Sequence, residues 1–288
     1  MSGGAGGAAR TGTASPVVVG VDESASARDA AEWAADLAAV WAVPLQLVHV
    51  VLGWPEDGPL PLTPDWLREM ADAAERSGVR DVAADVVPGG VVETLAARAA
   101  GARMLVVGSY GEGAWTGMLA GGAALSLIDR TTCPVAVIRG SAPEMPPPRS
   151  GPVVVGADGS PAADSAVDLA AELAVSLGSR MLTVQAVSAT PVDVATTRVA
   201  VVRERYPTLQ VEQQVAAGTA MNALSAHAHE ARMLVIGRHV AGGPGDPGVV
   251  LGVTGHALLE SAPCPVVIAA QPRPTTTATR LRAEPAAR

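Results

Sequence analysis

Short apolar runs alternate with helical patterns along the chain. Five runs have the length and the β-branched content of strands that are buried on both faces: residues 16–21, 45–51, 82–87, 104–107 and 135–138. Between them, apolar residues recur every three or four positions, most clearly in the stripe Ala27, Ala30, Ala31, Ala34, Leu37, Ala38 and Trp41. Strands that alternate with amphipathic helices predict an α/β fold with a parallel sheet.

Local signals place the ends of the helices. Ser24 or Ser26 can cap the helix that follows the first strand. Thr63, Pro64 and Gly78 bracket the next helix as cap, first-turn and stop residues. Further helices are predicted over residues 91–100 and 123–130.

The whole pattern then occurs a second time. VVVGADGS at 153–160 matches VVVGVDES at 17–24, ARMLVIG at 231–237 matches ARMLVVG at 102–108, and CPV at 264–266 matches CPV at 133–135. Ordered matches at a nearly constant spacing indicate a tandem duplication. We therefore expect a tail at 1–15, a domain at 16–140, a proline-rich linker at 141–150, a second domain at 151–270 and a disordered tail at 271–288.

Composition narrows the class of protein. Of the 288 residues, 49% are hydrophobic but only 2% are aromatic, so the core must consist mainly of Ala, Val and Leu. The chain contains no lysine, which excludes a P-loop lysine and a Schiff-base lysine. The net charge of −8 argues against nucleic acid as a partner. Two cysteines and no signal peptide or membrane-spanning run predict a cytoplasmic protein without a membrane partner.

A glycine-rich stretch carries the main functional signal. After the strand at 104–107, two residues separate Gly108 from Gly111, and nine separate Gly111 from Gly121, where a helix follows. Glycines let the backbone approach a ligand, and a helix start offers free N–H groups with a partial positive charge. The stretch therefore predicts an anion site. The alternative is that these glycines only form turns.

This spacing resembles the universal stress protein family, whose nucleotide-binding members carry G-x-x-G, nine residues, then G followed by Ser or Thr. The V-V-G-V-D start, the V-x-H-V second strand and the A-P-C-P-V close support the resemblance, which covers about nine-tenths of the chain. It implies two Rossmann-like domains, each a five-stranded parallel sheet in the order 3-2-1-4-5 with helices on both faces. It also implies that the two domains form a pseudo-dimer through their last strands, and it is compatible with a homodimer.

By this resemblance, the first half binds ATP where the strand order reverses. The implied site residues are Gly20, Val21 and Asp22 after the first strand, Val50 beside adenine, Val107, Gly108 and Gly111 at ribose and phosphate, and Gly121, Gly122 and Ala123 at the helix start. Gly122 replaces the usual hydroxyl residue, which removes a hydrogen bond worth ~1–3 kcal/mol to a charged partner. Asp22 is a candidate for holding Mg²⁺ indirectly, and otherwise it caps the following turn.

The second half departs further from the motif. Val240 replaces the second glycine, and fourteen residues separate Gly237 from Gly252, where the first half has twelve between Gly108 and Gly121. The insertion carries two prolines, and Val253 stands where Ser or Thr belongs. These changes predict a degenerate second site that binds no nucleotide.

Other polar residues suggest no catalytic centre. His227 and His229 are two apart on a helix, unlike a zinc pair, and are expected to be solvated or to cap the helix. His49 is expected to be a satisfied core histidine, and Cys133 and Cys264 to be buried. The sequence thus favours a nucleotide-binding module of the stress response. The alternatives are a slow Mg²⁺-dependent ATPase of the adenine nucleotide α-hydrolase type, and a scaffold that binds no nucleotide.

Overall fold

The structure is a computed structural model that describes residues 14–55, 58–59, 62–109, 122–142, 145–187, 195–241 and 248–270. The elements of the first half are β1 (Val17–Gly20), α1 (Ala25–Trp41), β2 (Leu45–Val51), α2 (Asp65–Arg76), β3 (Val82–Pro88), α3 (Val91–Arg98), β4 (Met104–Gly108), α4 (Gly122–Arg130) and β5 (Val135–Ile138). Those of the second half are β6 (Val153–Gly156), α5 (Pro161–Ser176), β7 (Met181–Val187), α6 (Ala195–Arg205), β8 (Val211–Ala217), α7 (Ala220–Ala228), β9 (Met233–Ile236), β10 (His239–Ala241), β11 (Gly248–Val250), α8 (Val253–Ser261) and β12 (Val266–Ile268).

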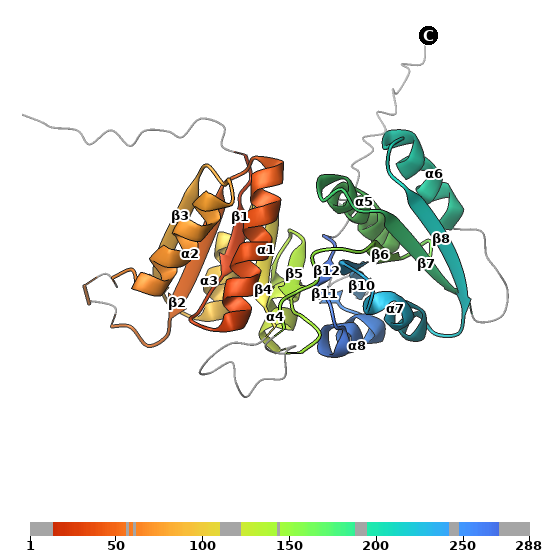
Figure 1. Cartoon of the computed structure of the whole chain (residues 1–288). Coiled ribbons are helices and arrows are strands. Elements are labelled where there is room, and N and C mark those ends of the chain that lie inside the picture. The colour runs from red at the N-terminus through yellow and green to blue at the C-terminus, as the bar shows by residue number, and fades with distance from the viewer. Residues whose placement is uncertain are drawn as a thin grey trace, which may run out of the picture.

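One ten-stranded sheet runs through both halves (Figure 1), in the order β3-β2-β1-β4-β5-β12-β9-β6-β7-β8. Within each half the strands are parallel and follow the predicted order 3-2-1-4-5. The halves meet where β5 and β12 pair antiparallel, with Ala136 opposite Val267. The prediction that the last strands lie at the junction is therefore confirmed. Because the strands of the two halves run in opposite directions, their carboxyl ends lie at opposite edges of the sheet.

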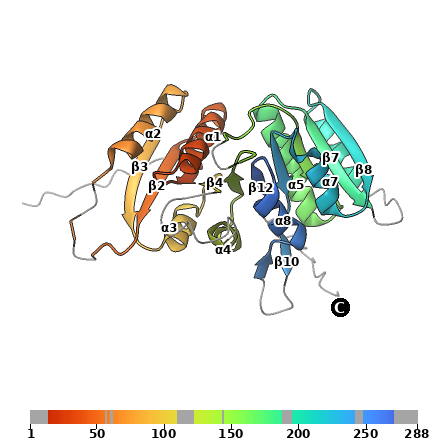
Figure 2. The ribbon, with the colours of Figure 1, turned by 60° about the horizontal axis from the view of Figure 1, so that its bottom comes forward.

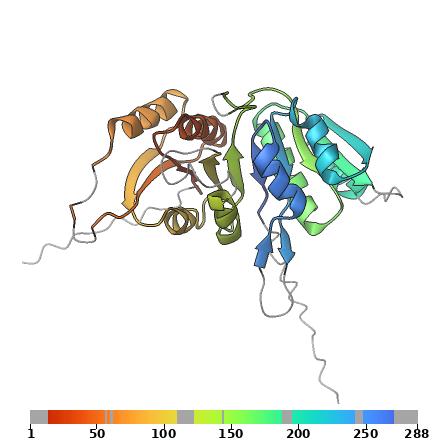
Figure 3. The same cartoon turned by 90° about the horizontal axis from the view of Figure 1, so that it is seen from below.

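Helices cover both faces of this sheet (Figure 3). Residues of α1, α2, α5 and α6 form one continuous buried cluster with alternate strand residues, and residues of α3, α4, α7 and α8 form the other. Alanine dominates the buried sides of α1 and α5, with Trp33 as the one buried aromatic residue of α1, which lets these helices approach the sheet closely. Both clusters include residues of both halves, so the duplicated units share their core.

The helix caps agree with the sequence in one case and differ in another. Ser24 caps α1 by accepting a hydrogen bond from the Ala27 backbone N–H at 3.1 Å. At α2, however, the prediction that Thr63 is the cap and Pro64 the first helical residue is wrong. Pro64 itself holds the cap position with an extended ψ of 156° and makes no side-chain cap. Arg68 instead reaches back and donates to the Thr63 carbonyl, which fixes the entry to the helix.

The junction is held by an arginine from each half. Arg238, which follows β9, is only 2% exposed and donates to the carbonyls of Ile128, Thr131 and Cys133 at 2.6, 2.9 and 3.3 Å. Arg139, which follows β5, donates to the carbonyl of Leu259 at 2.7 Å. Ile128 and Leu259 are equivalent positions, each seven residues after the last glycine of its loop motif. Each half thus satisfies a carbonyl at the end of the other half's last helix.

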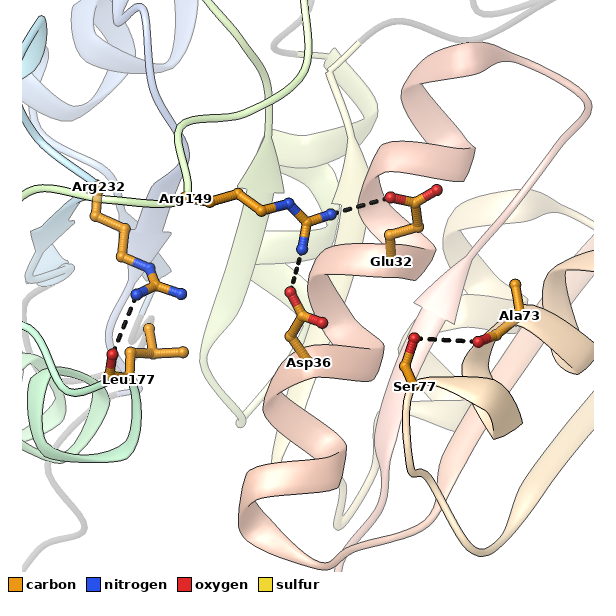
Figure 4. A network of polar contacts seen from close by, with 7 residues as sticks. All are labelled: Glu32, Asp36, Ala73, Ser77, Arg149, Leu177 and Arg232. Atoms are coloured by element: carbon orange, nitrogen blue, oxygen red, sulfur yellow. Dashed lines mark hydrogen bonds and ion pairs between the residues drawn. The ribbon is translucent and has the colours of Figure 1, made fainter.

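On the face of α1 and α5, a further hydrogen bond joins the halves, beside contacts within each half and to the linker. Trp41 Nε1 donates to the Ser176 hydroxyl at 2.8 Å, and the Arg103 guanidinium lies 4.0 Å above the Trp41 ring. Figure 4 shows that Arg149, from the linker, donates to both Glu32 and Asp36 on α1. In the same view Arg232 donates to the Leu177 carbonyl, which ends α5.

Candidate functional site

A small cavity lies at the carboxyl ends of β1, β2 and β4, where the strand order of the first half reverses. Its volume is about 50 Å³, and α3 closes one side through Val91 and Leu95. Six of the predicted site residues line it: Gly20, Val21, Asp22, Val50, Val107 and Gly108. The structure therefore brings the strand-end part of the predicted site together. Gly111 and Gly121 lie outside the described residues, Gly122 begins α4, and Ala123 is half-buried in its first turn.

Two glycines of this cavity have no room for a side chain. A Cβ at Gly20 would lie 2.6 Å from Leu95 Cδ1, and a Cβ at Gly108 would lie 2.8 Å from the Ser26 carbonyl oxygen. Gly108 thus lets the first turn of α1 pack against the end of β4. The equivalent Gly237 does the same in the second half, where a Cβ would lie 2.4 Å from the Ala162 carbonyl oxygen. Part of the glycine motif therefore serves packing as well as the cavity.

The polar side chains at the cavity have local partners. Asp22 Oδ1 accepts hydrogen bonds from the Ser24 backbone N–H at 3.1 Å and from its hydroxyl. This carboxylate caps the turn into α1, which is the alternative role that the sequence left open. His49 Nδ1 lies 3.0 Å from the Val21 carbonyl oxygen, and its ring packs edge-on against Trp66. His49 therefore has a hydrogen-bond partner, as expected, but it is half-buried at the cavity wall rather than in the core.

The second half contains a larger cavity that the sequence reasoning missed. It lies at the equivalent strand ends, of β6, β7 and β9, and reaches the start of α8, with a volume of about 210 Å³. Its lining includes Asp158 and Ser160 from the turn after β6, and Gly252, Val253 and Thr254 at the helix start. The sequence signal for this cavity is that several lining positions of the second half carry smaller side chains than the equivalent positions of the first half.

The loop between β9 and α8 also differs from the expectation of a simple insertion. Strands β10 and β11 pair antiparallel, with Val240 opposite Val249, in a hairpin that projects from the second half (Figures 2 and 3). Its β11 strand lies against α4 of the first half. Backbone N–H groups that pair within a hairpin cannot also converge on a phosphate. The expectation of a degenerate second site that binds no nucleotide stays a prediction.

Both cysteines are buried, as predicted, and we expect them to be unreactive. Burial raises the pKa of the Cys133 thiol and raises that of Cys264 to about 12, so neither forms thiolate at neutral pH. A disulfide reagent should therefore label neither residue in the native protein at pH 7 and both in denaturant. Rapid labelling of the native protein, followed by absorbance, would contradict this expectation.

The described part of the chain shows no candidate metal centre and no candidate membrane span. It contains no group of three or more His, Cys, Asp or Glu residues that could hold a metal ion. Over the same residues, no helix has the length and apolar character to span a membrane. His229 occupies the C-cap position of α7, in line with the expected capping role.

Comparison with known proteins identifies a family by sequence. The profile of the universal stress protein family matches residues 14–139. A universal stress protein of Mycobacterium tuberculosis is 30% identical over 285 residues, covering 88% of this chain and 95% of that protein. One from Mycobacterium bovis is 32% identical over 292 residues, covering 88% and 97%. The crystal structure of a universal stress protein from Archaeoglobus fulgidus shares the fold, with a TM-score of 0.67 at 19% identity over 90% of this chain and 99% of that one.

Proposed function

This chain belongs to the universal stress protein family, and from that premise we propose that its N-terminal half binds an adenine nucleotide, ATP, at the carboxyl edge of its sheet. The observation that carries the proposal is the cavity between β1, β2 and β4, followed in the chain by the glycine loop. Ligands of open α/β sheets bind at this reversal of strand order.

In this proposal, different residues contact the base, the ribose and the phosphates. The backbone at Val50 faces the base, and Gly108 and Gly111 let the chain run close to ribose and phosphates. The N-terminus of α4 at Gly122 supplies N–H groups and the positive end of the helix dipole. With a cavity of only about 50 Å³, the base stays partly exposed, and Gly122 offers no hydroxyl. Both features favour weak binding.

In this proposal the protein is a binding module of the stress response, in which ATP occupancy changes the affinity for a partner. Asp22 Oδ1 already accepts two hydrogen bonds from Ser24, so Mg²⁺ would be held indirectly, through water. A slow ATPase is the alternative from another class. Mg²⁺-dependent ADP release well above background that Asp22→Ala abolishes would favour the ATPase.

Calorimetry with ATP on the full chain tests the proposed site. Gly111→Val should abolish binding because the isopropyl group crowds the phosphates, whereas Gly122→Ser should strengthen it by restoring a hydroxyl donor. Thr254→Ala, at the other cavity, is the matched control and should leave the ATP affinity unchanged. Two equivalent ATP sites, or one site that Gly111→Val does not affect, would overturn the proposal.

A further inference from the structure

The ten-stranded sheet ends in two edge strands, β3 and β8, each of which pairs on one side only among the described residues (Figure 2). The two edges differ in how far helices cover them. Residues 82–87 of β3 are all half-buried, whereas the consecutive residues 212–215 of β8 are exposed on both faces of the strand. Val86 packs against the core, but its equivalent Val215 is 58% exposed. The β8 edge is therefore the more open of the two.

The register of β8 fixes which of its backbone groups point outward. In a parallel ladder, alternate residues of the outer strand direct both backbone groups to the neighbouring strand, and the residues between them direct both groups outward. At the start of β8, the Met181 N–H donates to the Gln210 carbonyl. At its end, the Gly218 N–H donates to the Val187 carbonyl. The even-numbered residues of β8 therefore bond to β7, and the odd-numbered residues face outward.

The two edges also differ in the features that block pairing with another strand. In β3, the same reasoning makes Pro88 an outward residue, and proline has no N–H to donate. In β8, an arginine blocks only the first outward residue, because Arg203 donates to the Val211 carbonyl at 2.9 Å. The segment 213–217 that follows contains no charged residue and no proline. Its outward backbone groups face away from the sheet, with Val215 at the centre.

We propose that two copies of this chain associate through β8, which pairs antiparallel with β8 of the second copy about a two-fold axis at Val215. In this register the two Val215 residues lie opposite each other, and Gln213 of one copy lies opposite Ala217 of the second. The outward N–H and C=O groups of these residues then bond to one another across the axis, as in any antiparallel ladder. The sheet continues from one copy into the next.

Three features of the segment 213–217 favour a second copy as the partner. The segment is uncharged, so a two-fold axis places no like charges opposite each other. Its outward residues are symmetric about Val215, which gives an isologous contact in which each strand satisfies the other. The chain already joins equivalent edges in this way, since β5 and β12 pair antiparallel at its junction. The ladder is short, so the contact falls below the roughly 1,200 Å² that stable complexes bury, and the dimer dissociates on dilution.

The test is sedimentation velocity of the full chain over a dilution series, with charges introduced at the two-fold axis. Val215→Lys and Val215→Glu each place two like charges opposite each other and should weaken the dimer by about tenfold or more. An equimolar mixture of the two variants should associate again, because a lysine then faces a glutamate. Val201→Lys on α6 is the matched control, since Val201 is 44% exposed. It lies two positions before Arg203, and so on another side of the helix from the residue that contacts β8.

The control should dimerise as the parent does, and equal melting temperatures of all variants should show that the fold is kept. A parent chain that stays monomeric at every concentration overturns the proposal, as it would if β8 paired with another protein or with a tail of its own chain. A dimer that Val215→Lys leaves intact, or that Val201→Lys weakens equally, also overturns it. So does a mixture of the two charged variants that fails to associate, because the register requires Val215 to face itself.

Discussion

Replacing Arg238 with methionine is expected to lower the free energy of unfolding by roughly 2–4 kcal/mol, because it leaves the carbonyls of Ile128, Thr131 and Cys133 without this donor. An opposing effect exists. Burial lowers the pKa of the Arg238 guanidinium, which reflects a desolvation cost that methionine would relieve. We expect the lost hydrogen bonds to dominate, since the three acceptors belong to the other half and cannot turn to water without opening the junction.

Urea unfolding followed by circular dichroism measures this change. Loss of Arg238 should also separate the unfolding of the two halves, so that one cooperative transition becomes two. Arg149→Gln is the matched control, because Arg149 also joins a distant segment to the first half but its side chain is 48% exposed. Its loss should cost at most about 1 kcal/mol. A variant Arg238→Met as stable as the parent would show that the buried charge contributes nothing net.

Replacing Gly237 with valine is expected to destabilise the second half by about 3 kcal/mol or more, at the upper end of overpacking effects. Its Cβ would lie 2.4 Å from the carbonyl oxygen and 2.5 Å from the carbonyl carbon of Ala162. Because these are backbone atoms, the strain cannot be relieved by a rotamer change, and the first turn of α5 must move away from β9.

A glycine at the same sheet edge provides the control. The nearest atom to a Cβ on Gly156 is a side-chain methyl of Leu224 at 3.4 Å, which is ordinary contact. Gly156→Ala should therefore leave the melting temperature within a few degrees of the parent. Thermal unfolding by calorimetry compares the two variants. Equal melting temperatures for Gly237→Val and the parent would refute the close approach of α5 to β9.

Features that depend on short-range patterns could be predicted from the sequence. The buried strands, the Ser24 cap and the alanine stripe of α1 follow from local periodicity and propensity. The order of the strands followed from the family resemblance. The duplication implied two similar sheets, and the family's pairing through the last strand gave the β5–β12 junction.

Features that depend on the other half could not be predicted. In the sequence, nothing distinguishes Arg238 from an ordinary loop residue. It becomes a buried hydrogen-bond donor only because α4 of the first half packs against it. The hairpin after β9 was interpreted as an insertion with prolines, since its strands are only three residues long. The second cavity was not predicted, because its lining comes from strand ends and helix starts that are far apart in the sequence.

The antiparallel pairing of β5 with β12 has a consequence for synthesis of the chain. When β5 leaves the ribosome, β12 lies more than a hundred residues further on and has not been made. Until then the edge of β5 offers unpaired N–H and C=O groups, and two nascent chains on one messenger could pair through it. Covalent linkage counters this risk, because it gives β12 an effective local concentration on the order of millimolar at β5. Because of the duplication, the β5–β12 contact forms within one chain, and its formation does not depend on the concentration of the protein in the cell.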